Sequence, residues 1–262
     1  MPLSDLTLET LAEWSAQARS QAQGGNLPQR IRPLATVNPQ GFAIAVVPVD
    51  APALHCGDPT QAIAVMSVIK PFLLLYALTQ FGTAAVFDWV GTAPSDQPFN
   101  SLTQLQLDGG RPRNPMINSG AITLCDRLPG ATGKARCEQF QTWLNAQTKT
   151  AFKLDPELLQ AVQAIGQEQN QRLTTTLAKY GRLQSDPSIT LDTYQRLCCL
   201  TGTIADFAKL GELLVGASAL APPMIDQPSA PEVTPPSRSA FGAVSADHRA
   251  MTTALMLTCG LY

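Results

Sequence analysis

An almost unbroken apolar run, AIAVMSVIKPFLLLYALTQFG at residues 62–82, constrains the fold of this chain more than any other stretch. It carries one serine and one lysine three positions apart, Ser67 and Lys70. Its longest uninterrupted apolar part, Pro71–Leu78, is too short to cross a bilayer as a helix. The run therefore predicts a helix in the core of a globular domain, with two polar side chains near its start.

The composition agrees with a globular chain and limits the class of partner. The protein has 262 residues, of which 45% are hydrophobic and 15% are charged, enough for one large domain or two modest ones with a real core. The net charge is −2 and no cluster of Lys and Arg occurs, so the sequence predicts binding neither to nucleic acid nor to a membrane. A small molecule or another protein is the expected partner.

The compartment follows from the N-terminus and the cysteines. The opening MPLSDLTLETLAEW lacks the basic and apolar regions of a signal peptide, which predicts a cytoplasmic protein. Six cysteines show no C-x-x-C pair and no zinc-like spacing, so we expect buried free thiols. The two histidines, His55 and His248, lie in unrelated segments, which argues against a histidine metal site or histidine-dependent catalysis.

Hydrophobic periodicity and breaker residues predict an α+β chain with few strands. The first helix is expected from Leu6 to Gln23, capped by Ser4 or Asp5, followed by a strand in residues 41–50 and a return strand in 50–58. Residues 93–122 are expected to form mostly ordered loop, and the proline-rich residues 221–238 an exposed loop. Further helices are predicted at 135–147, 156–180, 189–200, 204–215 and 247–258.

Ser67 and Lys70 share one helix face, because residues i and i+3 are neighbours on a helix. A serine hydroxyl needs a base to become a nucleophile, and a lysine can serve when burial lowers the pKa of its amine. The free N–H groups of the helix start can also stabilise an oxyanion. The alternative is a capping serine beside a lysine that extends to solvent, and S-x-x-K alone favours this simpler interpretation.

A second stretch of the sequence favours the catalytic interpretation of Ser67 and Lys70. PFNSLTQLQLDGGRPRNPMINSGAI, residues 98–122, resembles the signature of the serine-dependent, bacterial-type glutaminases, relatives of the penicillin-recognising serine hydrolases. The resemblance extends from NPQGFAIAV and CGD through SVIK to DTYQRLCCLTGTIADFAKLGELL and ALMLTCGLY, over roughly residues 27–262. It implies a β-lactamase/transpeptidase-like fold, with an N-terminal helix at 1–25 and a serine hydrolase domain at 26–262 into which residues 221–238 are inserted.

The resemblance also implies a role for each matching residue. Ser67 would be the nucleophile that accepts the acyl group, Lys70 its general base, and Tyr194 a second hydroxyl that handles protons. We therefore expect Ser67 at the start of its helix, within hydrogen-bond reach of Lys70 or Tyr194. Asn118, Asn170, Tyr262 and Gln163 would bind the substrate together with Ser67 and Tyr194, and Asn118 and Asn170 should face the cleft that contains Ser67. The substrate would be L-glutamine, hydrolysed to L-glutamate and ammonia without a metal or organic cofactor.

One departure from the family pattern concerns the substrate's ammonium group. The family has a glutamate seven residues before its asparagine, where this chain has Gln163, and the loss of that charge-assisted contact costs about 1.5–3 kcal/mol. Glu168 lies near but out of register, and a continuous helix would turn it to another face. Two smaller departures are Met66 in place of a glutamine and Gln169 in place of an arginine.

A larger departure is that the family continues past this point with further strands and a K-S-G-like motif. The resemblance therefore implies a sheet without its C-terminal strands, and we expect weak or no turnover by this chain alone. A truncated product, strands supplied by another chain, and a degenerate relative remain alternatives, and unpaired strand edges favour a homo-oligomer. The leading function is a glutaminase-type amidohydrolase; the rival is a catalytically degenerate relative that binds an amino acid or a partner, and a β-lactam or ester substrate is a weaker third option.

Overall fold

The computed structural model describes residues 5–48, 52–58, 60–166, 168–215 and 243–260. Helices predominate and the strands are short, so the predicted α+β class is confirmed. The predicted proline-rich loop at 221–238 lies outside the described residues, as does Ser4, one of the two expected caps of the first helix. The cap that the structure shows is Thr7, whose hydroxyl accepts a hydrogen bond from the Thr10 N–H.

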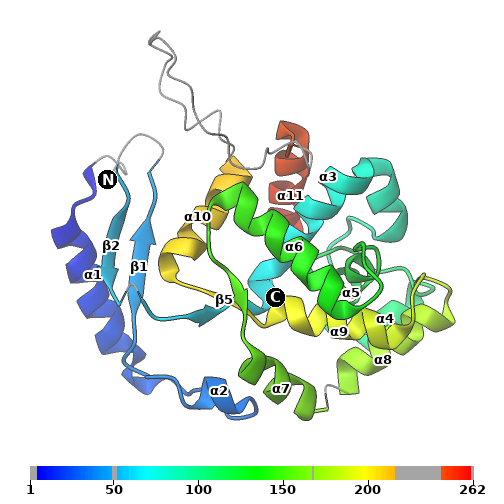
Figure 1. The fold of residues 1–262 in the computed structure, drawn as a ribbon, viewed down its shortest axis with the longest axis horizontal. Coiled ribbons are helices and arrows are strands. Elements are labelled where there is room, and N and C mark those ends of the chain that lie inside the picture. Colours follow the sequence, from blue (N-terminus) through cyan, green and yellow to red (C-terminus); the bar gives the residue numbers. More distant parts are fainter. Residues whose placement is uncertain (1–4, 49–51, 59, 167, 216–242, 261–262) are drawn as a thin grey trace, which may run out of the picture.

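The N-terminal part is a strand pair between two helices (Figure 1). Strand β1 (Ala43–Val46) pairs antiparallel with β2 (Leu54–Gly57), as the sequence predicted. Helix α1 (Leu8–Gln21) packs against this pair, and α10 (Ile204–Val215) contacts β1 from the other side. Two short helical turns, η2 (Ala22–Gly24) and α2 (Arg32–Ala35), connect α1 to β1.

A second, three-stranded sheet lies beside the pair, and the sequence analysis did not foresee it. Its order is β3 (Ile63–Ala64), β5 (Leu200–Gly202) and β4 (Lys153–Leu154), with antiparallel pairing on both sides of β5. The helix expected at 189–200 is α9 (Pro187–Cys198), and it ends where the chain turns into β5. Strands of two or three residues carry no usable periodicity, so only their pairing over long sequence distances reveals them.

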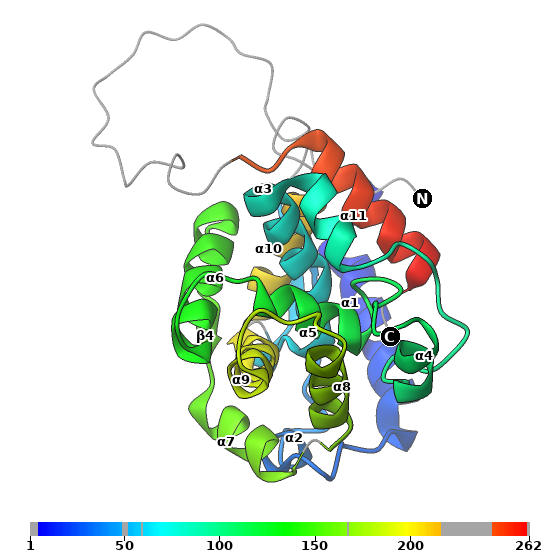
Figure 2. The ribbon, with the colours of Figure 1, turned by 90° about the vertical axis from the view of Figure 1, so that its right-hand side faces the viewer.

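The helical body is built around α3 (Ile69–Trp89), which contains most of the apolar run. Helices α5 (Asn118–Asp126) and α11 (Ala246–Cys259) pack against α3, and α6 (Gly133–Thr148) packs against α9 (Figure 2). Tyr76 of α3 makes edge-on contacts with Phe140 and Trp143 of α6, with ring centroids 5.5 and 5.1 Å apart.

Residues Met66–Trp89 are long and apolar enough to cross a membrane by length and composition alone. However, 56% of the qualifying window is buried inside the protein, so packing in the core accounts for its composition.

One expectation about the chain's middle was wrong. The single helix expected at 156–180 is two helices, α7 (Pro156–Ala164) and α8 (Glu168–Lys179), separated at Gly166, whose φ of 59° interrupts a right-handed helix. Residues 93–122 are mostly loop, as expected, interrupted by the short helix α4 (Leu102–Leu107), which Ser101 caps, and followed by α5 from Asn118.

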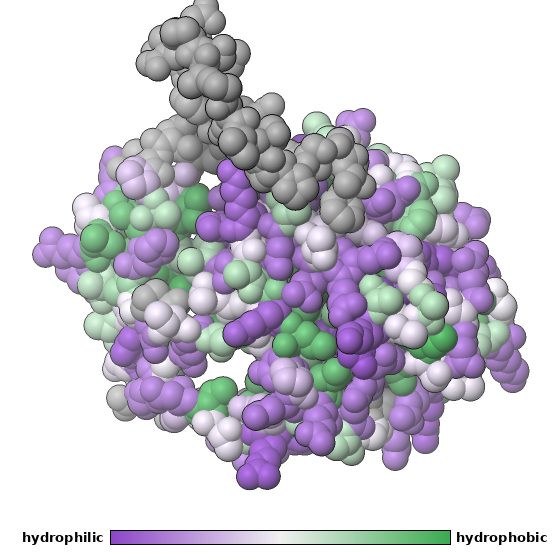
Figure 3. Space-filling model, in the orientation of Figure 1, coloured by the Kyte–Doolittle hydropathy of each residue, from purple (hydrophilic) through white to green (hydrophobic). Residues whose placement is uncertain are grey.

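The surface is mixed. On the face shown in Figure 3, small hydrophobic patches are interspersed with hydrophilic side chains. Scattered apolar side chains are normal on a protein surface.

Candidate active site

Ser67 lies in a tight turn between a strand and the central helix. The N–H of Val65 donates a 2.8 Å hydrogen bond to the carbonyl of Leu200, which anchors the turn to β5. Met66 then adopts a left-handed backbone with a φ of 46°, a strained conformation for a residue with a side chain. Ser67 follows in the single 3-10 turn η3 (Met66–Val68), directly before α3. The predicted position at a helix start is confirmed.

Lys70 is buried without a carboxylate partner among the described residues. Its side chain is 0% exposed, and its Nζ donates hydrogen bonds of 2.9 Å to the Met116 carbonyl and to Asn118 Oδ1. The ring of Phe99 lies 5.7 Å from Nζ. Burial lowers the pKa of Lys70 from 10.5 to about 8, while the nearby Cys198 thiol acts in the opposite direction. Roughly a tenth of the amine is therefore neutral at pH 7.

One expected contact is not formed. Within the described part of the chain, the Ser67 hydroxyl makes no hydrogen bond to Lys70 or Tyr194, although we expected one. The ammonium of Lys70 instead turns to two oxygens at the start of α5, because a desolvated charge is stabilised by hydrogen-bond acceptors.

Asn118 joins residues from three other helices. Its Oδ1 accepts hydrogen bonds from Lys70 and, at 3.2 Å, from the Tyr194 hydroxyl on α9. Its Nδ2 donates to Asn170 Oδ1 on α8 at 2.9 Å. Tyr194 is 5% exposed, and burial holds the pKa of its phenol well above the usual value, so at neutral pH it is a hydrogen-bond donor. Asn118 and Asn170 were expected to face the cleft that contains Ser67; the structure brings the two asparagines together, although they lie 52 positions apart.

The segment NPMINSG, residues 114–120, positions Asn118 through two residues to which the sequence analysis gave no role. Asn114 Oδ1 accepts the N–H groups of Met116 and Ile117, and its Nδ2 donates to the Ala93 carbonyl. A Cβ on Gly120 would lie 2.0 Å from the Asn114 carbonyl oxygen, so only glycine allows this approach. Residue types that favour turns were visible in the sequence, but the contacts between them were not.

Helix α8 is tied to the loop that carries Phe99. Gln169 Nε2 donates a 2.6 Å hydrogen bond to the Asn100 carbonyl, and the Asn118 N–H donates to the Phe99 carbonyl at 2.9 Å. These bonds hold the first turn of α8 close to the first turn of α5, and so place Asn170 beside Asn118.

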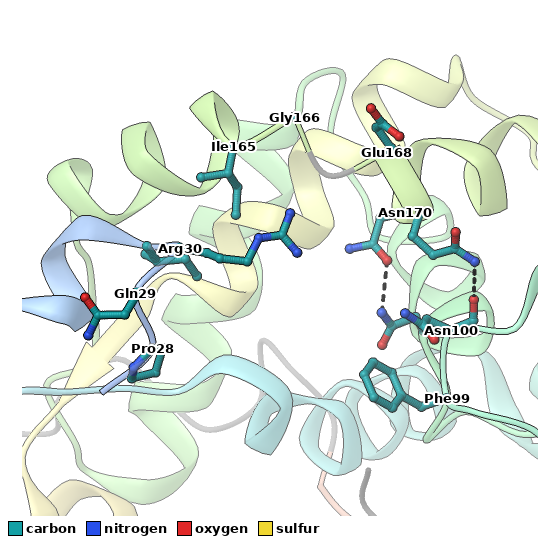
Figure 4. A pocket seen from close by; sticks show the side chains of 12 residues that line it. Pro28, Gln29, Arg30, Phe99, Asn100, Ile165, Gly166, Glu168 and Asn170 are labelled. Atoms are coloured by element: carbon teal, nitrogen blue, oxygen red, sulfur yellow. Dashed lines mark hydrogen bonds between the residues drawn. The ribbon is translucent and has the colours of Figure 1, made fainter. Parts of the chain in front are cut away.

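A pocket of about 740 Å³ opens above this pair of asparagines (Figure 4). Its walls come from three places: the connection before α2, the loop with Phe99, and the junction of α7 and α8. Arg30 extends its guanidinium into the pocket towards Asn170, and Glu168 lies on the α8 side. Lys70, Tyr194 and Ser67 are not among the lining residues; Lys70 and Tyr194 connect to the pocket through Asn118.

Gln163 is not in this pocket. It lies exposed on α7, where its Nε2 donates a 3.0 Å hydrogen bond to Asp192 Oδ1, and Asp192 also pairs with Arg196 at 2.8 Å. The expectation that Gln163 contacts the substrate is therefore not supported by its position. The argument against Glu168 was also wrong, because it assumed a continuous helix, whereas the break at Gly166 changes the direction of the chain before Glu168. Tyr262, also expected at the site, lies outside the described residues.

The remaining lining residues gave no sequence signal. Arg30 comes from a short polar connection far from every motif, and Phe99 was noted only as part of PFNS. Their proximity to Asn118 and Asn170 arises from the packing of separate segments.

The chain is similar to known proteins of one family. A model of the glutaminase family matches residues 25–262. A glutaminase of Synechocystis sp. is 42% identical over 209 residues, which are 80% of this chain and 64% of that relative. The chain thus spans less than two thirds of that protein's length.

Two solved structures share the fold. A probable glutaminase, ybaS, superposes with a TM-score of 0.78 at 27% identity, over 98% of this chain and 79% of that one. A probable glutaminase from Bacillus subtilis, complexed with 6-diazo-5-oxo-L-norleucine, gives a TM-score of 0.77 at 23% identity, over 98% and 74% of the two chains. The second likeness concerns the fold alone. The predicted β-lactamase-like architecture is confirmed.

Proposed function

Because this chain belongs to the glutaminase family, we propose that it hydrolyses the side-chain amide of L-glutamine to L-glutamate and ammonia. The observation that carries the proposal is the hydrogen-bond network in which Asn118 joins Lys70, Tyr194 and Asn170 below an open pocket. A buried lysine with a pKa of about 8 is unusual, and perturbed pKa values of this kind are typical of catalytic sites.

In the proposed reaction, Ser67 Oγ attacks the amide carbon while the neutral amine of Lys70 takes the hydroxyl proton. The N–H groups at the start of α3 stabilise the oxyanion. Ammonia leaves with a proton returned from the site, for which Tyr194 is a second donor, and water then hydrolyses the acyl-enzyme. For the first step, Lys70 must give up a hydrogen bond to Asn118 or Met116 and turn to Ser67.

Substrate binding is assigned to Asn118, Asn170 and Glu168. The two amides would hold polar groups of glutamine after exchanging their mutual hydrogen bond for bonds to the ligand. Glu168, which lines the pocket, would pair with the substrate ammonium in place of the family's glutamate. A role for Tyr262 remains a prediction.

The test combines turnover with covalent labelling. Purified protein is assayed for ammonia release from L-glutamine, and its mass is measured after incubation with 6-diazo-5-oxo-L-norleucine. We expect ammonia release and a single adduct on Ser67, both abolished in Ser67→Ala and retained in the control Ser188→Ala, whose serine is exposed on α9. Neither activity nor adduct in the wild-type protein, or an adduct that persists in Ser67→Ala, would refute the proposal.

The second candidate is a catalytically degenerate relative that binds an amino acid. It is favoured by one observation, the missing hydrogen bond between Ser67 and either Lys70 or Tyr194 in the described structure. Binding of L-glutamine in a calorimeter, without ammonia release and without an adduct, would select this candidate.

We further propose that the protein works in the cytoplasm. All six cysteines are free thiols, five of them buried, which agrees with the expectation from their spacing and is typical of a reducing compartment.

A further inference from the structure

Arg30 occupies an unusual position for an exposed arginine. It lies in the connection between η2 and α2, yet its guanidinium extends into the pocket and faces Asn170 across it (Figure 4). Long cationic side chains on a surface usually extend into water or pair with a neighbouring carboxylate. Arg30 instead points towards the two asparagines that close the pocket floor.

Within the described part of the chain, the guanidinium of Arg30 has no hydrogen-bond or ion-pair partner. Glu168 lines the same pocket but does not form an ion pair with it. The arginine that lines the pocket is therefore available to a ligand, and its planar N–H groups match a carboxylate in a two-point contact.

The other cation near the site cannot take this role. Lys70 is fully buried behind Asn118, its amine is already bonded to Met116 and Asn118, and its proposed task requires the neutral form. An acidic group on a ligand in this pocket thus meets only one available cation among the described lining residues, Arg30.

We propose that Arg30 binds the α-carboxylate of the substrate, which restricts the pocket to ω-amides that carry a free acid at the other end. This inference rests on the proposed function for its substrate. The amide end then lies towards Asn118 and the acid end towards the N-terminal connection, so that residues before β1 help to select the substrate.

The test compares three variants with ligands that differ in one group. Arg30→Gln removes the charge, Arg30→Lys keeps a charge without the planar fork, and Arg32→Gln removes a charge two residues away that does not line the pocket. Each protein is assayed for turnover of L-glutamine and of L-glutamine α-amide, in which a carboxamide replaces the carboxylate. Calorimetry measures the affinity for L-glutamate independently of turnover, and thermal melting checks that each variant is folded.

We expect Arg30→Gln to raise the KM for L-glutamine and the Kd for L-glutamate by roughly 10- to 100-fold, with little change in kcat. Arg30→Lys should raise this KM and this Kd by a smaller factor, and Arg32→Gln should behave as wild type. The KM for the α-amide should be the same with and without Arg30. Equal effects of Arg30→Gln on glutamine and its α-amide would show that the arginine does not contact the carboxylate.

The outcomes separate the two proposals. Normal turnover with an unchanged KM in Arg30→Gln would overturn this inference and leave the glutaminase proposal intact. Arg30-dependent binding of L-glutamate without turnover would support the inference and refute the enzyme. No turnover of L-glutamine together with no binding of L-glutamate by the wild-type protein would overturn both.

Discussion

At the scale of single residues, burial of Lys70 lowers the pKa of its amine and so allows it to act as a base. A lysine with its ordinary pKa of 10.5 would present roughly one neutral amine in 3,000 at pH 7, whereas a pKa of about 8 gives roughly one in ten. Burial among the apolar side chains of α3 therefore makes Lys70 a usable base, because it raises the free energy of the charged ammonium form. The same run that predicted a buried helix explains the reactivity of the one lysine inside it.

This effect predicts a pH profile for attack by Ser67. Because the neutral amine is the base, the rate of labelling by 6-diazo-5-oxo-L-norleucine should rise about tenfold per pH unit below pH 8 and level off above it. The measurement is the labelling rate by mass spectrometry between pH 6 and 10. Lys70→Met should abolish the rise together with most of the labelling; a rate already constant from pH 6 to 8 would contradict the role of Lys70.

Gly120 gives a second prediction at this scale. In Gly120→Ala the new Cβ would meet the Asn114 carbonyl oxygen at 2.0 Å, so the turn that carries Asn118 must shift. We expect a loss of roughly 1–3 kcal/mol in the free energy of unfolding, measured by urea denaturation. The matched control is Gly211→Ala in α10, where no atom lies within 4 Å of the added carbon, and which should stabilise the protein by roughly 0.5–1 kcal/mol. Equal effects of the two substitutions would refute the proposed steric reason.

At the scale of elements, the site depends on the contacts that hold its helices in position relative to one another. Asn118, Asn170 and Tyr194 come from α5, α8 and α9, and their side chains meet only if these helices keep their relative positions. One such contact is made by Asp126 at the end of α5. Its buried carboxylate accepts hydrogen bonds from the N–H groups of Gln184 and Ser185, in the connection from α8 to α9. It also accepts the hydroxyl of Thr190 on α9.

Removing this carboxylate should loosen both helices. Asp126→Ala leaves two backbone N–H groups without their acceptor and removes the 3.7 Å ion pair with Arg127, while the Thr190 hydroxyl keeps only its bond to the Asp186 carbonyl. We therefore expect the free energy of unfolding to fall by roughly 3 kcal/mol or more. The control is Asp58→Ala, whose exposed carboxylate bonds only locally to Thr60 and which should change stability by less than about 0.5 kcal/mol. Denaturant titration measures both, and an Asp126→Ala variant as stable as the control would contradict this account.

At the scale of the whole molecule, the N-terminal segment is a structural layer as well as a wall of the pocket. Helix α1 packs on the strand pair, and its Leu11 is fully buried while its Leu8 is 57% exposed. The connection that follows α1 carries Arg30 into the pocket. Loss of the packing of α1 should therefore lower the stability of the whole fold.

The comparison of Leu11→Ala with Leu8→Ala tests this coupling. Deleting the buried side chain should cost about 2–5 kcal/mol and lower the melting temperature of one cooperative transition, while the exposed one should cost little. Calorimetry would show the result. A separate low-temperature transition in Leu11→Ala, with the main transition unchanged, would mean that α1 folds independently of the rest.

The sequence by itself determined the features that depend on neighbouring residues. The apolar run required a buried helix, the i, i+3 spacing placed Ser67 and Lys70 within one turn, and NPMINSG contained the turn residues that orient Asn118. The long motif also determined the family. These signals are local because backbone conformation and side-chain spacing within a helix follow from a few adjacent residues.

Only the tertiary structure decided which distant groups meet. It directed Lys70 to Asn118 instead of Ser67, joined Gln163 to Asp192 on the surface, and brought Glu168 into the pocket through the break at Gly166. It also placed Arg30 opposite Asn170, 140 positions later in the chain. The physical reason is that such contacts depend on the relative orientation of separately formed helices, and a single glycine in a left-handed conformation changes that orientation without altering the polarity pattern around it.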